Sequence, residues 1–135
     1  MNDSDWGALV RDLKNIDDVD VAVGAGERLH RTATPEDVHR LGELLQDESF
    51  FAREAAAWPL SELAGAAALP QLFRAYQRGF DEGHDNDAFS AALADMAEAD
   101  PEGVRRVLDV LVKADDPALR ENAFWLLEFC KSRDA

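Results

Sequence analysis

Apolar residues recur along the chain at intervals of three and four, the spacing that places side chains on one face of an α-helix. Four such stripes lie within Leu9–Leu13, Val38–Leu45, Leu69–Tyr76 and Val104–Leu111. β-branched residues are few, and no stretch alternates apolar and polar residues beside a hairpin turn. The pattern therefore predicts an all-α fold.

Helix start and stop signals divide this pattern into eight predicted helices. Thr34-Pro35-Glu36-Asp37 is typical of an N-cap followed by a proline and acids in the first turn, and Asp100-Pro101 and Asp116-Pro117 repeat it. Glycines that favour helix ends or turns stand at Gly65, Gly79 and Gly83. The predicted helices span residues 4–14, 18–31, 35–46, 49–64, 67–79, 85–98, 101–114 and 117–132.

An internal repeat indicates how these helices are organised. Arg53–Leu60 and Arg120–Leu127 share Arg, Glu, Ala, Trp and Leu in the same register, 67 residues apart. A degraded copy halfway, at Asn86–Leu93, and a weaker copy at Ala22–Leu29 complete the series. This predicts helix pairs that bury their apolar faces only by stacking on one another. Short connections and the lack of a linker predict one domain over residues 1–135.

The repeated segments resemble HEAT repeats of the short bacterial type that also occurs in phycobilin lyase-like proteins. That pattern has an Asp before the second helix, then Arg, two small residues one turn later, and Leu after another turn. The second unit matches it with Asp47, Arg53, Ala56, Ala57 and Leu60. The fourth matches it with Asp116, Arg120, Ala123 and Leu127, and Phe124 replaces one small residue.

The resemblance weakens in the other two units, because the third lacks the Arg and the first lacks both Arg and Asp. It implies a right-handed α-solenoid of about four antiparallel helix pairs, with the second helices lining the concave face. It also implies structural roles for Arg53 and Arg120, which would join neighbouring units.

In each unit, the positions one, five and nine residues after the repeat arginine share one helix face. This face points away from the residues on which neighbouring helix pairs would stack. Carboxylates lie beside tryptophan there, a combination that suits Lys and Arg side chains through ion pairs and cation–π contacts. The alternative is that each Trp packs against neighbouring helices and that the acids are merely solvated. The candidate partner-binding residues are Glu54, Trp58, Glu62, Asp87, Asp95, Glu121, Trp125, Glu128 and Phe129.

The overall charge narrows the choice of partner. The chain has 28 acidic and 14 basic residues, for a formal net charge of −14. Nucleic acids and anionic membrane surfaces attract cationic proteins, so we expect neither as a partner. A basic protein or peptide is the partner that this charge favours.

No motif indicates catalysis, a metal site or a cofactor. His30, His39 and His84 show no ligand spacing with each other or with Cys130, which we expect to be a core thiol. The acidic turn Asp81–Asp87 lacks the spacing of a calcium loop. With one cysteine, no signal peptide and no long apolar run, we expect a cytoplasmic protein without a disulfide or membrane span.

These features together predict a non-enzymatic protein-binding module that uses an acidic concave face. An immunity protein that neutralises a cationic toxin domain is one version of this function. The alternative is a scaffold, adaptor or lyase-related subunit. Such a protein would associate with a partner or with a second copy of itself through the last helix, which is apolar nearly all round over Ala123–Cys130.

Overall fold

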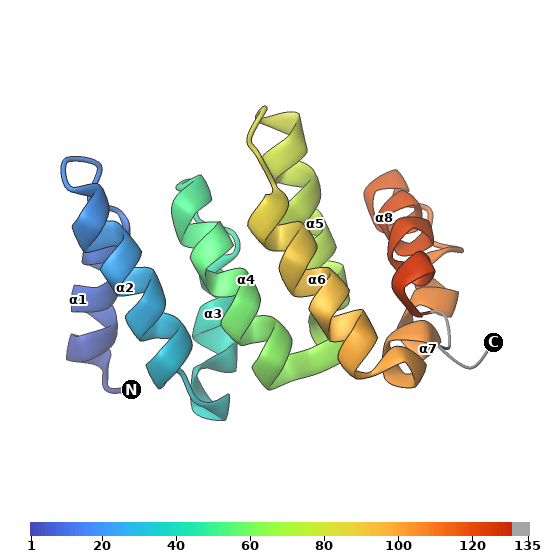
Figure 1. Ribbon diagram of the computed structural model, residues 1–135, viewed down its shortest axis with the longest axis horizontal. Helices are drawn as coiled ribbons and strands as arrows, with labels where there is room; N and C mark the ends of the chain where they lie inside the picture. The colour runs from blue at the N-terminus through green and yellow to red at the C-terminus, as the bar shows by residue number, and fades with distance from the viewer. Residues whose placement is uncertain (131–135) are drawn as a thin grey trace. The chain divides into compact units, whose positions relative to one another are not determined.

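The computed structural model describes residues 1–130 and confirms the all-α prediction (Figure 1). Within these residues the chain forms eight α-helices and three short 3-10 helices. The α-helices are α1 (Asp3–Leu13), α2 (Val19–Thr32), α3 (Val38–Leu44), α4 (Phe50–Ala64), α5 (Leu69–Asp81), α6 (Asp87–Ala99), α7 (Pro101–Leu111) and α8 (Pro117–Leu127). The 3-10 helices are η1 (Pro35–Asp37), η2 (Gly65–Ala68) and η3 (Glu128–Cys130).

The helices gather into two compact units. Unit 1, Met1–Leu63, contains α1 to α4, and unit 2, Ala64–Ala135, contains α5 to α8 and is described as far as Cys130. Each unit has its own buried apolar residues and is considered separately below. The expectation of one domain over the whole chain stays a prediction.

All eight predicted helices are present, and most of their ends agree with the prediction within three residues. Two helices change type at one end. The helix predicted over 35–46 begins as the 3-10 turn η1, and the one predicted over 117–132 becomes 3-10 after Leu127. Its last two predicted residues, 131 and 132, lie outside the described residues.

The predicted capping signals work as expected. The Asp100 side chain accepts a hydrogen bond from the Gly103 N–H at 3.1 Å and caps α7. Asp116 caps α8 in the same way, through the Ala118 N–H at 2.9 Å. Each cap satisfies an N–H group that the first helical turn leaves without a partner.

The glycine prediction is correct at two positions and wrong at the third. Gly65 and Gly83 adopt φ values of 62° and 81°, the left-handed region that glycine enters without strain. Gly79, in contrast, lies inside α5 rather than at its end. Its role is close packing, because a Cβ atom there would lie 2.3 Å from the Asn86 side-chain oxygen.

In unit 1, small residues allow the second helices of the predicted pairs to pack closely. Ala25 of α2 and Ala52 and Ala56 of α4 are fully buried. A Cβ atom built on Gly26 of α2 would touch the Ala55 Cβ atom of α4 at 3.8 Å. Figure 1 shows α2 and α4 side by side in this unit. Ala25, Ala52 and Ala56 thus belong to a helix-packing surface made of small residues.

In unit 2, larger side chains fill the interior. Phe73 of α5 and Phe89 of α6 are buried together with leucines from every helix of the unit. Helix α8 contacts α5, α6 and α7, so it is the common neighbour of the unit's other helices. The fully buried leucines include Leu69, Leu72, Leu93, Leu108 and Leu126.

The two repeat arginines make the same contacts, one in each unit. Arg53 donates to the backbone carbonyls of Asp47 and Glu48, at 2.9 and 3.1 Å. Arg120 donates to the carbonyls of Ala114 and Asp115, at 3.1 and 3.4 Å. In both cases the acceptors stand six and five residues before the arginine, in the turn between paired helices. Both arginines therefore brace the turn of their own helix pair, and the expectation that they join neighbouring units stays a prediction.

Asp47 joins this turn to the preceding helix pair. Its carboxylate pairs with Lys14, at the end of α1, with 2.6 Å between Oδ2 and Nζ. Its other oxygen accepts the Ser49 N–H at 2.8 Å. Burial alone would raise the pKa of Asp47, but the Lys14 and Ser49 hydrogen bonds, with the charges of Lys14 and Arg53, lower it below its usual value.

In the described part of the chain, no helix has the length and apolar character needed to cross a membrane.

Candidate functional site

The candidate residues of unit 1 lie on α4 at intervals of four, which places Glu54, Trp58 and Glu62 along one face. Trp58 is half-buried, and its indole Nε1–H donates to Glu62 Oε1 at 2.8 Å. The second oxygen of Glu62 lies 3.0 Å from His30 Nε2 on α2. The Trp58 and His30 rings meet edge to face with centroids 6.1 Å apart. We call His30, Trp58 and Glu62 the His30 cluster.

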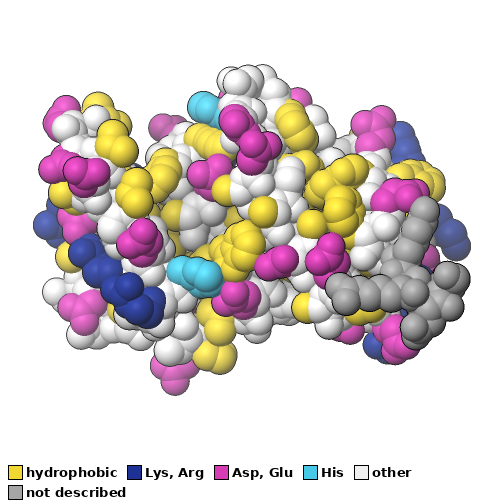
Figure 2. Space-filling view, in the orientation of Figure 1, with side chains coloured by type: hydrophobic (Ala, Val, Ile, Leu, Met, Phe, Trp, Pro, Cys, Tyr) yellow, Lys and Arg dark blue, Asp and Glu magenta, His cyan; other side chains and the backbone are white. Residues whose placement is uncertain are grey.

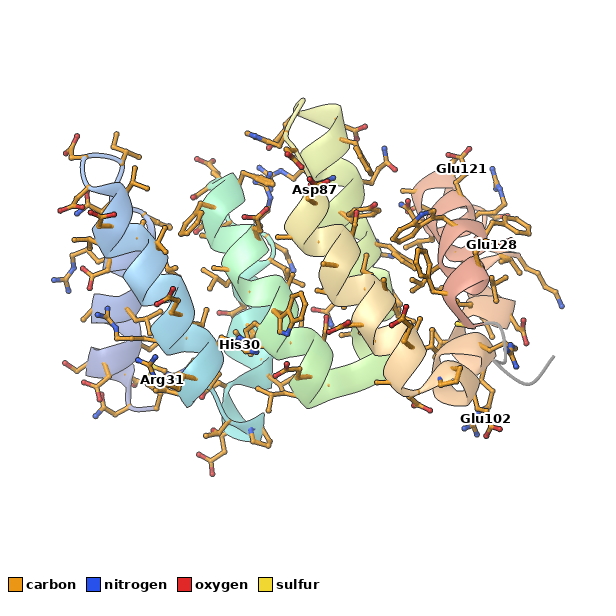
Figure 3. All side chains as sticks on the ribbon, in the orientation of Figure 1. His30, Arg31, Asp87, Glu102, Glu121 and Glu128 are labelled. Carbon is orange, nitrogen blue, oxygen red and sulfur yellow. The ribbon has the colours of Figure 1, made fainter. Side chains whose placement is uncertain are left out.

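His30 is the member of this cluster that sequence reasoning missed. From the sequence, His30 is considered only as a metal ligand, for which its spacing is unsuited. Yet the weak first repeat carries a usable signal, because its 31-residue step places His30 level with Ser61, next to Glu62. His30 stands in the last turn of α2, where Figure 3 shows its side chain turned toward α4.

The candidate residues of unit 2 include a continuous set of aromatic rings. Trp125 of α8 stacks on Tyr76 of α5, with centroids 5.4 Å apart and planes 27° from parallel. Phe129 meets Trp125 edge to face at 5.2 Å, and Phe80 meets Tyr76 in the same way at 4.8 Å. We call Phe80, Tyr76, Trp125 and Phe129 the aromatic row.

Tyr76 fixes the aromatic row to the core of unit 2. It is buried, its ring packs near that of Phe89 at 6.2 Å, and its hydroxyl lies 2.7 Å from the Ser90 hydroxyl on α6. The sequence placed Tyr76 only on a core stripe. Because Tyr76 lies 49 residues before Trp125, outside the repeat step, no periodicity in the sequence pairs them.

The aromatic row reaches the surface and has acidic neighbours. Phe80 is 50% exposed, and Trp125 and Phe129 are half-buried. The charged residues of α6 are all acidic, and they are exposed. On α8 and η3, Glu121 and Glu128 are exposed as well (Figure 3). Figure 2 shows acidic and hydrophobic side chains next to one another over α6, with no Lys or Arg in view there.

The two candidate tryptophans are therefore neither core residues nor free surface residues. Each is half-buried and held by a defined neighbour, Glu62 for Trp58 and Tyr76 for Trp125. The candidate acids Asp87 and Asp95 are exposed on α6, and Glu54 is half-buried. Trp58 and Glu62 are in contact, as are Trp125 and Phe129.

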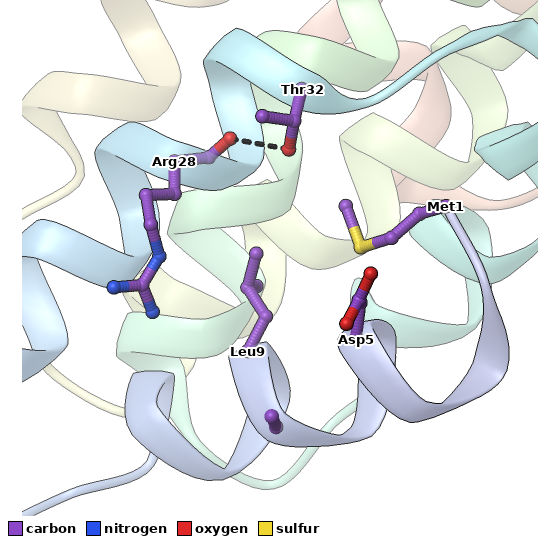
Figure 4. Close-up of a pocket in the computed structure, with 6 residues that line it drawn as sticks. Met1, Asp5, Leu9, Arg28 and Thr32 are labelled. Carbon is purple, nitrogen blue, oxygen red and sulfur yellow. Dashed lines mark hydrogen bonds between the residues drawn. The ribbon is translucent and has the colours of Figure 1, made fainter.

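A hollow of about 480 Å³ opens between α1 and α2 in unit 1 (Figure 4). Two of its polar lining residues, Arg28 and Thr32, are engaged in internal contacts. Arg28 pairs with Asp12 at 2.9 Å, and the Thr32 hydroxyl donates to the Arg28 carbonyl at 2.7 Å. These contacts leave fewer polar groups of the hollow available to a ligand.

Cys130 has the surroundings of a structural thiol. It is fully buried at the end of η3. Burial raises the pKa of its thiol; the charge of Arg105 opposes this rise and that of Asp109 adds to it. A raised pKa keeps the group protonated and poorly nucleophilic at neutral pH. Among residues 1–130, no three His, Cys, Asp or Glu side chains are grouped so that they could hold a metal ion.

Comparisons of the chain with protein-family models, with curated proteins and with solved structures find no match.

Proposed function

We propose that this chain is a non-enzymatic protein-binding module that recognises a basic protein or peptide, with the aromatic row of unit 2 as its principal contact. The observation that carries the proposal is the stacking of half-buried Trp125 on buried Tyr76 among exposed carboxylates. A ring held in this way loses little conformational freedom when a partner binds it. Tryptophan is also the residue most enriched at energetically dominant interface positions.

The chemistry of the aromatic row favours Lys and Arg side chains. A cation over a tryptophan face gains about 0.5–2 kcal/mol, and an adjacent carboxylate can accept its N–H groups. Glu121 precedes Trp125 by one helical turn on α8. Glu128 follows Trp125 by three residues, at the start of η3. Each unit carries an excess of acids, 14 acidic and 6 basic residues in unit 1 and 14 and 8 in unit 2. This excess would speed the approach of a cationic partner.

The His30 cluster gives unit 1 a smaller surface of the same kind. Glu62 holds the Trp58 indole in place, so Trp58 and the carboxylate stand side by side for a cationic group. An immunity protein that occludes a cationic toxin domain remains the specific form of this function that we propose. The acidity of both units and the half-buried Trp58 and Trp125 support it.

The resemblance to HEAT repeats is part of the same proposal. We infer helix pairs of the HEAT type, arranged as a right-handed solenoid of about four pairs and located in the cytoplasm. The best support is the identical use of Arg53 and Arg120, six and five residues after their carbonyl acceptors. A shared contact in the same register is what a structural repeat requires.

The test is a calorimetric titration of the full chain with a Lys- and Arg-rich peptide, which measures the Kd. Trp125→Ala should weaken binding about three- to thirtyfold, the equivalent of one cation–π contact of about 0.5–2 kcal/mol. Phe124→Ala is the matched control, because Phe124 precedes Trp125 on α8 and is 57% exposed but has no place in the aromatic row. Equal affinities for the two variants would refute the role of Trp125.

A capture experiment then identifies the natural partner. Lysate of the native host is passed over the immobilised chain and eluted with increasing salt. The proposal expects a basic protein that salt releases and that the double variant Glu121→Lys/Glu128→Lys does not retain. If that protein is toxic, it supports the immunity role. Salt-independent retention argues against electrostatic recognition.

A second candidate is association through exposed apolar side chains of α7 and of the last helix, α8. Phe124 of α8 is 57% exposed and Val110 of α7 is 69% exposed, and such large apolar side chains are common at interfaces. A scaffold, adaptor or lyase-related subunit, or a homodimer, would use them. This candidate predicts association that resists salt and is lost in Phe124→Asp. Association that survives this substitution would exclude it.

A further inference from the structure

Unit 1 has a second surface feature, which the sequence analysis did not single out. An apolar hollow of about 240 Å³ opens at the turn between α1 and α2. Its floor consists of Leu13, Ala22 and Phe51, and its rim of Ile16, Val19 and Val23. We call these six residues the turn hollow. All belong to unit 1, and none belongs to the His30 cluster.

The rim of the turn hollow consists of strongly exposed apolar side chains. Ile16 is 92% exposed and Val19 is 71% exposed, and Val23 follows Val19 by one helical turn. Three β-branched residues therefore stand around one opening. Isolated apolar residues are ordinary on protein surfaces, but several around one hollow are typical of an interaction site.

The turn that presents Ile16 is held in one conformation. The Asn15 side-chain oxygen accepts the backbone N–H groups of Asp17 and Asp18, each at 3.0 Å. The Asp18 side chain in turn accepts the Val21 N–H at 3.2 Å and caps α2. These hydrogen bonds join residues on both sides of Ile16, so they hold the turn in the conformation that exposes the Ile16 side chain. A preorganised anchor costs little entropy on binding.

The charges around the turn hollow select the chemistry of its occupant. Asp17, Asp18 and Asp20 are exposed beside the rim. Lys14, which lines the same hollow, is paired with Asp47 and so has part of its charge compensated. Figure 2 shows acidic and hydrophobic side chains interleaved at this turn, at the upper left of the view. The surroundings thus complement a cationic group.

The size and charge of the turn hollow argue against two other occupants. Its volume lies below the range of about 300–1,000 Å³ that is usual for small-molecule pockets, whereas one or two aliphatic side chains would fit. A second copy of the chain would bring a further net charge of −14 against the same carboxylates. Like charges held together in this way oppose association.

We propose that the turn hollow docks an amphipathic basic segment of a partner protein, which inserts an aliphatic side chain between Ile16, Val19 and Val23 and directs flanking Lys or Arg side chains to Asp17 and Asp20. This site goes beyond the aromatic row and does not depend on it. A partner helix with apolar residues at intervals of three and four, and basic residues elsewhere, has the required form.

The experiment uses the full chain labelled with ¹⁵N and a short amphipathic peptide of Leu and Lys. Binding should shift the amide signals of residues 13–23 and 49–51 in NMR spectra. Val19→Asp and Ile16→Asp should each raise the Kd about tenfold or more, as expected for loss of an interface anchor. Since these substitutions add negative charge, electrostatics alone would strengthen binding of a cationic peptide, and weaker binding in a folded variant reports lost apolar contact.

Two controls make the result specific. Val110→Asp replaces a valine of nearly equal exposure on α7 in unit 2 and should leave the Kd unchanged within about twofold. A peptide with Ser in place of Leu, and with the same charge, should bind far more weakly. Ile16 lies outside helices and is exposed, so Ile16→Asp keeps the test valid even where Val19→Asp disturbs α2.

Three outcomes would overturn the proposal. One is a Kd that is the same in Val19→Asp, Ile16→Asp and Val110→Asp. Another is a Ser peptide that shifts the amide signals of residues 13–23 with the same Kd as the Leu peptide. The third is self-association of the chain in the absence of peptide, if Ile16→Asp abolishes this self-association. A second copy of the chain would then occupy the turn hollow. Trp125→Ala should leave these shifts in place, so failure here is distinct from failure of the aromatic row.

Discussion

At the scale of single residues, the repeat arginines show how a surface-type side chain becomes part of the core. Arg53 is fully buried, yet its guanidinium donates to two carbonyls in the turn before its own helix. Those carbonyls follow the end of α3 and could not bond within it. Arg53 therefore supplies hydrogen-bond donors to two backbone carbonyls that lie beyond the end of a helix.

This contact predicts a large loss of stability in Arg53→Met. The variant keeps side-chain length but leaves two carbonyls without a donor, and we expect unfolding free energy to fall by about 3 kcal/mol. Arg120→Met should cost less, about 1–2 kcal/mol, because Arg120 is only half-buried and its second bond is longer. Urea unfolding followed by circular dichroism measures both.

The control is Arg74→Met, since Arg74 is exposed on α5. Its unfolding free energy should stay within about 0.5 kcal/mol of the parent. Equal losses at positions 53 and 74 would show that the carbonyl contacts contribute nothing.

The Lys14–Asp47 pair predicts a pH dependence of stability. Because the folded pKa of Asp47 is lowered, the pair stabilises the fold above the unfolded pKa of about 3.9, and this stabilisation is lost as the pH falls through the folded value. Lys14→Met removes most of what lowers that pKa. We expect the variant to be less stable by about 1 kcal/mol at pH 7, and the difference to be smaller at pH 3, which lies below the unfolded pKa.

Urea unfolding at the two pH values measures this difference. Arg28→Met serves as the comparison, because the Arg28–Asp12 pair is exposed and its contribution should be small at either pH. A Lys14→Met difference that is identical at pH 7 and pH 3 would contradict the assignment to Asp47.

At the scale of helices, Gly79 links α5 to the start of α6. The buried Asn86 side chain lies against Gly79 and donates to the Tyr76 carbonyl at 2.8 Å. In Gly79→Ala the new Cβ would stand 2.3 Å from the Asn86 oxygen, so Asn86 has to move and its hydrogen bond is lost. We expect Gly79→Ala to lower the unfolding free energy by about 2 kcal/mol, which thermal unfolding can measure.

Gly24→Ala is the matched control within another helix. Gly24 lies inside α2, and a Cβ atom there would meet nothing within 4 Å. Alanine is the better helix former, so the variant should gain up to about 1 kcal/mol. The prediction for Gly79 fails where both substitutions stabilise the chain.

The sequence could predict the helices themselves, because caps and apolar spacing act locally. Asp100 and Asp116 cap their helices as expected. Gly79 was misassigned because its reason is a contact with Asn86 across a turn, which no local rule contains. The same limit applies to the candidate site, where the repeat located Trp58 and Trp125 but not their neighbours. His30 and Tyr76 come from other helices, and only packing brings them to these rings.

At the scale of the whole molecule, net charge is the dominant property. The chain carries 28 acidic and 14 basic residues, and both units share the excess. Several acids form ion pairs, as Asp47 does with Lys14 and Asp12 with Arg28. Basic residues are only half as numerous as acidic ones, however, so many carboxylates have no basic residue to pair with. Repulsion among the remaining carboxylates opposes the compact state.

Added NaCl should therefore raise the melting temperature. The screening length falls from about 30 Å at 0.01 M salt to about 8 Å at 0.15 M, so repulsion between distant carboxylates weakens more than the attraction within close pairs. The same salt should weaken binding of a basic peptide, so stability and affinity should change in opposite directions. Neutralising three exposed acids together, as in Asp17→Asn, Asp95→Asn and Glu98→Gln, should reduce both effects. A melting temperature that falls with NaCl would show instead that the attraction within ion pairs outweighs the repulsion. The excess of negative charge would then favour binding of a basic partner without destabilising the fold.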